Sequence, residues 1–115
     1  MSKIKIHDPF FGKEEKLAIN AVLESHQWAS SKGNNKVSEF EKKFKSFVNS
    51  DECIAVDSGS SALLLSMSLM DVKNKEVILP SLCHVSAAHA VTLNGGKPIF
   101  VDVDPKNLCL DLDLV

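Results

Sequence analysis

A cluster of small hydroxyl side chains precedes an apolar run in the segment VDSGSSALLLSMSL, residues 56–69. The first N–H groups of a helix lack intrahelical acceptors and carry a partial positive charge. Glycine lets a ligand approach such a backbone closely, and serine hydroxyls add hydrogen-bond donors. The pattern therefore predicts a phosphate-binding turn at Gly59, Ser60 and Ser61. The structural alternative is an ordinary serine cap with a turn glycine. Neither GxxxxGK[ST] nor GxGxxG is present.

The second group that can act on a ligand is His84, within PSLCHVSAAHA. It stands directly before a run of small residues that favours a helix. A planar imidazole at this point can stack on an aromatic ligand whose phosphate lies in the first turn; a purely structural histidine is the alternative. Cys83 beside it has no partner base in the sequence, which favours packing over nucleophilic chemistry.

Asp102 and Asp104 form a third polar segment, and paired carboxylates can bind metals or transfer protons. Asp104 precedes Pro105, which is more typical of a turn. The three cysteines (Cys53, Cys83 and Cys109) contain no CxxC pair, which argues against zinc and against a disulfide framework. We therefore predict no metal site and no catalytic residue among these groups.

The hydrophobic pattern predicts an α/β arrangement that positions these residues. Helices are expected at residues 13–25, 37–48, 62–70 and 85–93, strands at 53–56, 76–79 and 99–102, a turn at 9–12 and a polar loop at 30–35. Strands that alternate with helices in this way indicate a mostly parallel sheet. Ligands of such sheets bind at the carboxyl ends of the strands, and the three polar segments are all expected there.

Composition limits the classes of partner. The chain has 115 residues and a net charge of −2, which gives no electrostatic case for nucleic acid or an anionic membrane. It contains no arginine, so a phosphate site must use backbone N–H groups, hydroxyls or lysine. We find neither a signal peptide nor an apolar run of about 18 residues. Reduced thiols in the cytoplasm are the expected state.

In this order, the segments resemble the N-terminal part of the DegT-type nucleotide-sugar aminotransferases. The resemblance runs from PFFGKEE through VSEFEKKFKSFV to EVILPSLCHVSAAHAVTLNGGKPIFVDVDP, and its most specific parts are SGSSAL and PIFVDVDP. It implies a fold type I α/β domain, with a mostly parallel sheet flanked by helices as in aspartate aminotransferase. Residues 1–115 would be the N-terminal portion of this cofactor-binding large domain, which is incomplete because its C-terminal remainder is absent.

The resemblance also implies a cofactor, pyridoxal 5′-phosphate. By position, Gly59, Ser60 and Ser61 would bind its phosphate and His84 would stack on its pyridine ring. The implied activity is transfer of an amino group from an amino acid to a nucleotide-linked keto sugar, in lipopolysaccharide (O-antigen) or other surface polysaccharide biosynthesis. The full-length relatives are homodimers, and neither nucleic acid nor membrane is an implied partner.

The resemblance stops short of the catalytic groups. In the family, the acid that pairs with the pyridine nitrogen and the lysine that holds the cofactor lie beyond the position that corresponds to residue 115. We therefore expect no turnover from this chain alone. Two alternatives stay open, namely a pyridoxamine-phosphate-dependent sugar dehydratase of the same family and a truncated, non-catalytic module that binds a phosphate ligand.

The same comparison predicts incomplete packing. Residues 76–79 and 99–102 are expected to pair with each other, whereas residues 53–56 lack their neighbouring strand. The apolar helix 62–70 is then left uncovered. Exposed apolar surface of this kind predicts aggregation or dependence on a partner chain.

Overall fold

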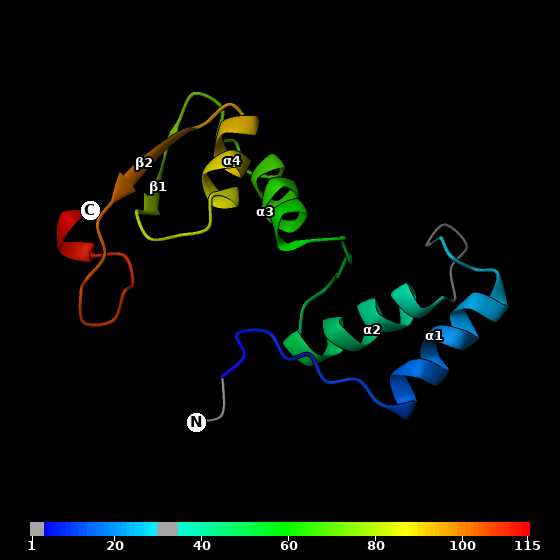
Figure 1. Cartoon of the computed structure of the whole chain (residues 1–115). Coiled ribbons are helices and arrows are strands. Elements are labelled where there is room, and N and C mark those ends of the chain that lie inside the picture. The colour runs from blue at the N-terminus through cyan, green and yellow to red at the C-terminus, as the bar shows by residue number, and fades with distance from the viewer. Residues whose placement is uncertain (1–3, 30–34) are drawn as a thin grey trace. The chain divides into compact units, whose positions relative to one another are not determined.

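The computed structural model describes residues 4–29 and 35–115. Two compact units follow one another along the chain, Met1–Ala55 and Val56–Val115, and each is described here by itself. Helices α1 and α2 belong to the first unit, and the second contains both helices and strands (Figure 1). The predicted polar loop 30–35 lies outside the described residues, apart from Asn35.

The first helix of the N-terminal unit, α1 (Lys13–Ser25), has the bounds that its amphipathic pattern predicts. The Gly12 N–H donates to Oε2 of Glu15 at 2.6 Å, so an acidic side chain caps the positive end of the helix. The helix ends at Ser25, and the next residue, His26, caps it in a left-handed backbone conformation (φ 55°). Residues 9–12 form no turn and are irregular, so the turn predicted there is wrong. Gly12 serves instead as the N-cap of α1.

The second helix, α2 (Lys36–Val48), is capped by Asn35, whose side-chain oxygen accepts the Ser38 N–H at 3.0 Å. Phe40 and Phe44 are stacked with their ring centroids 5.6 Å apart. These rings belong to the helical period of apolar residues that predicts the helix. The prediction of a helix at residues 37–48 is thus confirmed with one additional residue at its start.

The strand predicted at residues 53–56 is wrong, since these residues have no regular structure. The Ala55 N–H donates to Oε1 of Glu41 in α2 at 2.9 Å, a bond that a strand would have made to a neighbour. A β-strand gains its stability from such a neighbour, and within the described residues none pairs with this segment. Local β-branched composition alone therefore did not produce a strand.

The C-terminal unit contains two parallel strands, β1 (Glu76–Pro80) and β2 (Lys97–Val101), in the register Ile78 opposite Ile99. Helix α4 (Ser86–Leu93) connects them, and α3 (Gly59–Ser68) precedes them. A short 3₁₀ helix, η2 (Leu112–Leu114), follows. The pairing predicted between residues 76–79 and 99–102 is confirmed, and in Figure 1 both strands point toward the same end of the unit.

A small core holds this unit together. Val72, Ala90 and Val91 are the buried hydrophobic residues of the described chain, and Val91 is only 1% exposed. Gly96 is essential to this packing, because a Cβ atom there would lie 2.8 Å from Cγ1 of Val91. Helix α4 thereby packs on both strands, as a crossover helix in a βαβ unit does.

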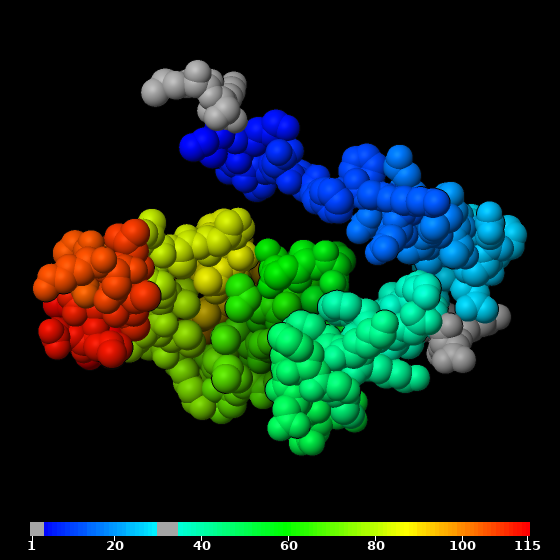
Figure 2. Space-filling view, turned by 90° about the horizontal axis from the view of Figure 1, so that it is seen from below, coloured from blue at the N-terminus to red at the C-terminus, as the bar shows by residue number. Residues whose placement is uncertain are grey.

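Helix α3 packs on α4, and Figure 2 shows its green atoms beside the yellow atoms of α4. The rest of its apolar surface is not covered: Leu63, Leu64 and Leu65 are exposed. The helix begins three residues earlier and ends two residues earlier than the predicted 62–70, and Leu69, which directly follows it, is 84% exposed. The uncovered apolar helix that the sequence predicts is therefore present. None of the helices formed by residues 4–29 and 35–115 has both the length and the apolar character that crossing a membrane requires.

Candidate functional site

The turn before α3 presents unpaired backbone donors. The Ser58 side chain caps the helix by accepting the Ser61 N–H at 3.1 Å, and the Ser58 carbonyl accepts the Ala62 N–H at 3.0 Å. Within the described chain, the N–H groups of Gly59 and Ser60 have no acceptor. Two donors at the positive end of a ten-residue helix are thus available to an anion.

Gly59 leaves the space in front of these donors open. A Cβ atom added at Gly59 would have no heavy atom within 4 Å outside its immediate neighbours. Its φ is not in the left-handed region, so backbone strain does not require a glycine here. The open space at Gly59 would allow a ligand to approach the backbone closely.

Asp57 places a negative charge at the edge of the same turn. Hydrogen bonding from Ser61, with smaller contributions from the Asp57 backbone and from Ser58, lowers the pKa of the Asp57 carboxyl group below its usual value. The Ser58 Oγ lies 3.4 Å from Oδ1 of Asp57 and 3.0 Å from Oγ of Ser61. The carboxylate therefore orders the two hydroxyls, while its charge opposes the binding of an anion.

His84 caps the start of α4 through its ring. The Ser86 N–H donates to Nδ1 of His84 at 3.2 Å, and the Ser86 Oγ lies 2.8 Å from the same atom. An imidazole nitrogen that accepts a backbone N–H carries no proton, so this contact favours the form of the ring in which Nδ1 is unprotonated. The structural role that the sequence left open is thus real, and it also fixes how the ring is held.

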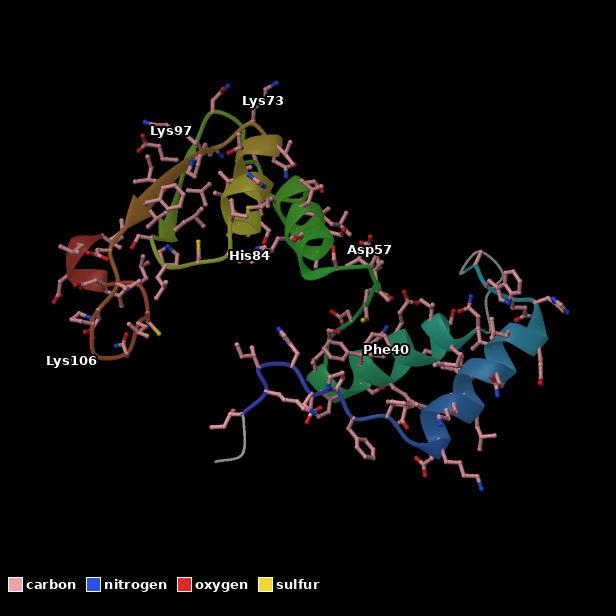
Figure 3. All side chains as sticks on the ribbon, viewed as in Figure 1. Phe40, Asp57, Lys73, His84, Lys97 and Lys106 are labelled. Atoms are coloured by element: carbon pink, nitrogen blue, oxygen red, sulfur yellow. The ribbon has the colours of Figure 1, made fainter. Side chains whose placement is uncertain are left out.

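The two predicted segments meet in one pocket of about 300 Å³ between α3 and α4. Ser60 and Ser61 line it from α3, and His84 lines it from the loop before α4. The other lining residues are Leu64, Val85, Ser86, His89, Ala90 and Leu93. Figure 3 shows His84 at the start of α4 and Asp57 ahead of α3. Gly59 is not a lining residue, but it begins the helix that supplies Ser60 and Ser61.

Sequence reasoning did not assign Ser86 and His89 to this site. Both follow His84 on one face of α4, at the spacing of three to four residues that Ala90 and Leu93 continue. That spacing is visible in the sequence, but which face of the helix turns toward α3 depends on packing. The missed residues are therefore a consequence of tertiary structure.

The remaining polar candidates lie in structural positions. Oδ1 of Asp104 accepts the Lys106 N–H at 2.9 Å, as the turn interpretation predicts. Asp102 accepts the Val103 N–H at 2.8 Å and a hydrogen bond from the Ser81 hydroxyl at 3.2 Å. Cys83 is exposed. Among residues 4–29 and 35–115, no three histidine, cysteine, aspartate or glutamate side chains are grouped to hold a metal ion.

The C-terminal unit is thus an α/β unit in which Ser60, Ser61 and His84 line one pocket. The particular family follows from comparison. The model of the DegT/DnrJ/EryC1/StrS aminotransferase family matches residues 9–115, and the chain belongs to this family. The resemblance inferred from SGSSAL and PIFVDVDP is confirmed.

Individual relatives agree with this assignment. The chain is 34% identical over 111 residues to a dTDP-4-dehydro-2,3,6-trideoxy-D-glucose 4-aminotransferase of Saccharopolyspora spinosa, covering 96% of this chain and 29% of that protein. It is 38% identical to the spore coat polysaccharide biosynthesis protein SpsC of Bacillus subtilis, covering 90% of this chain and 26% of the relative.

The fold assignment rests on solved structures. The structure of the E. coli GDP-4-keto-6-deoxy-D-mannose-3-dehydratase with bound hydrated PLP matches with a TM-score of 0.84 and 25% identity, covering 98% of this chain and 30% of that one. The predicted fold, the large-domain α/β fold of fold type I transferases, is confirmed. The chain spans only 26–30% of the length of these three relatives.

Proposed function

We propose that this chain is the N-terminal portion of the large domain of a nucleotide-sugar aminotransferase and supplies part of its pyridoxal 5′-phosphate site. The observation that carries the proposal is the shared pocket of Ser60, Ser61 and His84, which come from segments separated by a whole strand. A resemblance in sequence does not by itself require these side chains to meet. Their meeting supports one binding site for a phosphate joined to a flat ring.

The donor set fits the phosphate group. The N–H groups of Gly59 and Ser60 point out of the helix end without acceptors in the described structure, and Ser60 adds a hydroxyl. The space beyond Gly59 is open. Such a helix end binds phosphate without arginine, which the whole sequence lacks. Gly59, Ser60 and Ser61 are therefore the residues proposed to hold the phosphate.

His84 fits the ring of the cofactor. Ser86 holds its imidazole at the N-terminal end of α4, so the ring offers a face for stacking. Leu64 and Leu93 add apolar walls to the pocket. Pyridoxal phosphate, when bound, supplies the electron sink for amino-group transfer. The described residues bind and orient it, and the chain's own contribution to the proposed reaction is this positioning.

The substrate class follows from the relatives' names. The relative from Saccharopolyspora spinosa is a 4-aminotransferase of a dTDP-linked dehydro sugar, and SpsC is a polysaccharide biosynthesis protein. We extend these properties to the whole protein as a nucleotide-linked keto sugar, an amino-acid amino donor and a role in surface polysaccharide synthesis. A homodimer in the cytoplasm belongs to the same proposal.

A dehydratase is the second candidate, because one matching structure is that of a sugar 3-dehydratase with bound hydrated PLP. Both candidates need the same phosphate turn and the same ring contact. The residues described here support both equally, so the binding experiment below tests the feature they share.

The proposal is tested by titrating the whole chain, labelled with ¹⁵N, with pyridoxal phosphate and with pyridoxal, which lacks the phosphate. We expect the amide signals of Gly59 and Ser60 and the ring signals of His84 to shift with pyridoxal phosphate. Pyridoxal should leave the two amides unchanged. Shifts confined to other residues, or equal binding of both compounds, would contradict the proposal.

A further inference from the structure

Ser86 makes two contacts to one atom of His84. Its backbone N–H donates to Nδ1 at 3.2 Å, and its Oγ lies 2.8 Å from the same nitrogen. Ser86 also lines the pocket, together with the ring that it contacts. Within the described chain, Nε2 of His84 has no hydrogen-bond partner. The two nitrogens of this ring are therefore in very different surroundings.

These contacts determine where the ring proton lies. A backbone N–H can only donate, so Nδ1 must accept and carries no proton. The Ser86 hydroxyl, which can donate or accept, must then donate as well. Both donors favour the neutral ring with its proton on Nε2, since the other tautomer would bring an N–H group against an N–H group.

We propose that Ser86 is a positioning residue that fixes His84 in the Nε2–H tautomer and holds its ring in the pocket. The ring then keeps its faces free and retains Nε2–H as its one remaining donor. A ligand with a flat ring then meets the imidazole in a defined orientation. The effect of this positioning on the binding of pyridoxal phosphate rests on the proposed function. The tautomer of His84 itself does not depend on any ligand.

The tautomer is measured on the whole chain without ligand, by long-range ¹H–¹⁵N correlation spectra of the histidine rings. We expect His84 to show a single Nε2–H form. The Ser86→Ala variant keeps the backbone donor and loses the hydroxyl, so the ratio of Nε2–H to Nδ1–H should fall about threefold to tenfold. Ser86→Thr restores a hydroxyl and should restore the ratio.

His89 provides the internal control, because it lines the same pocket and no hydrogen bond to its ring occurs in the described residues. Its tautomer ratio should not change in either Ser86 variant. A merely structural role of Ser86 would lower stability in Ser86→Ala and leave the His84 ratio unchanged. That result, or a wild-type His84 with the same mixture as His89, would overturn the proposal.

Binding separates this inference from the proposed function. We expect Ser86→Ala to bind pyridoxal phosphate about threefold to tenfold more weakly than the wild type, and Ser86→Thr to bind equally well. One outcome is that the chain shows the Nε2–H form of His84, loses part of it in Ser86→Ala, and yet does not bind pyridoxal phosphate. That result would support the positioning of His84 by Ser86 and contradict the proposed function. If Ser86→Ala alters the tautomer ratio of His84 but binds pyridoxal phosphate as well as the wild type, the proposed role of Ser86 in ligand binding is overturned.

Discussion

Asn94 joins α4 to α3 by donating from Nδ2 to the carbonyl oxygen of Leu64 at 3.2 Å. The same Nδ2 donates to the carbonyl oxygen of Ala90 at 2.8 Å. Leu64 and Ala90 both line the pocket, so one side chain links its two walls. The spacing of the two helices thus depends on a polar residue that lies outside the pocket.

The first prediction concerns this link. Asn94→Ala removes both donors and should lower the free energy of unfolding by about 1–2 kcal/mol, with weaker binding of pyridoxal phosphate because α3 and α4 separate. Urea unfolding followed by circular dichroism, and a binding titration, measure the two effects. Ser46→Ala, which removes a bond to the Lys42 carbonyl within exposed α2, is the control and should leave binding unchanged.

The second prediction separates access to the phosphate site from folding. Gly59→Ala places a methyl group in open space, so the fold should be retained and the start of α3 slightly favoured, by about 0.5–1 kcal/mol. We expect the same methyl group to hinder the close approach of a phosphate to the Gly59 and Ser60 N–H groups. Binding of pyridoxal phosphate should therefore fall at least tenfold, as measured by calorimetry.

Gly96→Ala is the matched control for that substitution. Its Cβ would meet Val91 Cγ1 at 2.8 Å and the Val72 carbonyl oxygen at 3.1 Å, so it should destabilise the unit by about 1–3 kcal/mol. The free energy of unfolding should thus rise slightly in Gly59→Ala and fall in Gly96→Ala. Equal loss of stability in both would show that Gly59 is required by the fold and not by a ligand.

The third prediction divides the two roles of His84. His84→Phe keeps a flat ring but loses both contacts to Ser86, so it should still bind pyridoxal phosphate, about threefold to tenfold more weakly than the wild type, while stability falls by about 0.5–2 kcal/mol. His84→Asn keeps an acceptor for the Ser86 N–H, so it should retain stability and lose binding. Thermal unfolding and a binding titration, carried out on both variants, test this directly. Loss of binding in both variants would contradict a stacking role.

The fourth prediction concerns pH. Because hydrogen bonding from Ser61 lowers the pKa of Asp57 in the folded chain, its carboxylate stabilises the turn at every pH above the unfolded value of about 3.9. That stability is lost as the pH falls through the lower, folded-state pKa. A ¹³C carboxyl titration should show Asp57 titrating below its usual range. In Ser61→Ala its pKa should rise toward that range, and no rise would contradict the assigned cause.

The fifth prediction concerns the uncovered side of α3. Leu69 is 84% exposed and Met70 is 59% exposed, so the chain should associate with itself as its concentration rises. Leu69→Lys should lower the apparent mass in light scattering. Leu112→Lys, at a residue that is also highly exposed but lies in η2, should have a smaller effect. Equal effects would show that exposure in general, and not the α3 surface, drives association.

Most of the fold could be predicted from the sequence. The amphipathic periods of α1 and α2 are local and gave the correct helices. The apolar runs gave both strands, but β1 ends one residue later than predicted, and β2 begins two residues earlier and ends one residue earlier than the predicted 99–102. Residues 53–56 have the composition of a strand but no partner in the described structure, so composition alone misled. Strand formation depends on a neighbour that a local pattern does not contain.

The candidate site was predictable only in part. Ser60, Ser61 and His84 could be named because each precedes or begins a helix after an apolar segment. Ser86 was missed because its importance lies in a bond to the ring two residues before it. Asn94 was missed because its partner, Leu64, is thirty residues away in sequence. Contacts between side chains of separate elements are set by packing, and the sequence pattern does not specify them.

The parallel pairing of β1 and β2 has a consequence for how such a site can be enlarged. Each strand keeps one lateral row of N–H and C=O groups that no strand of the described chain occupies. A third parallel strand can join on either flank without changing the existing register of Ile78 and Ile99. Every strand gained in this way would deliver one more loop to the end where His84 lies, and the architecture is in this sense modular.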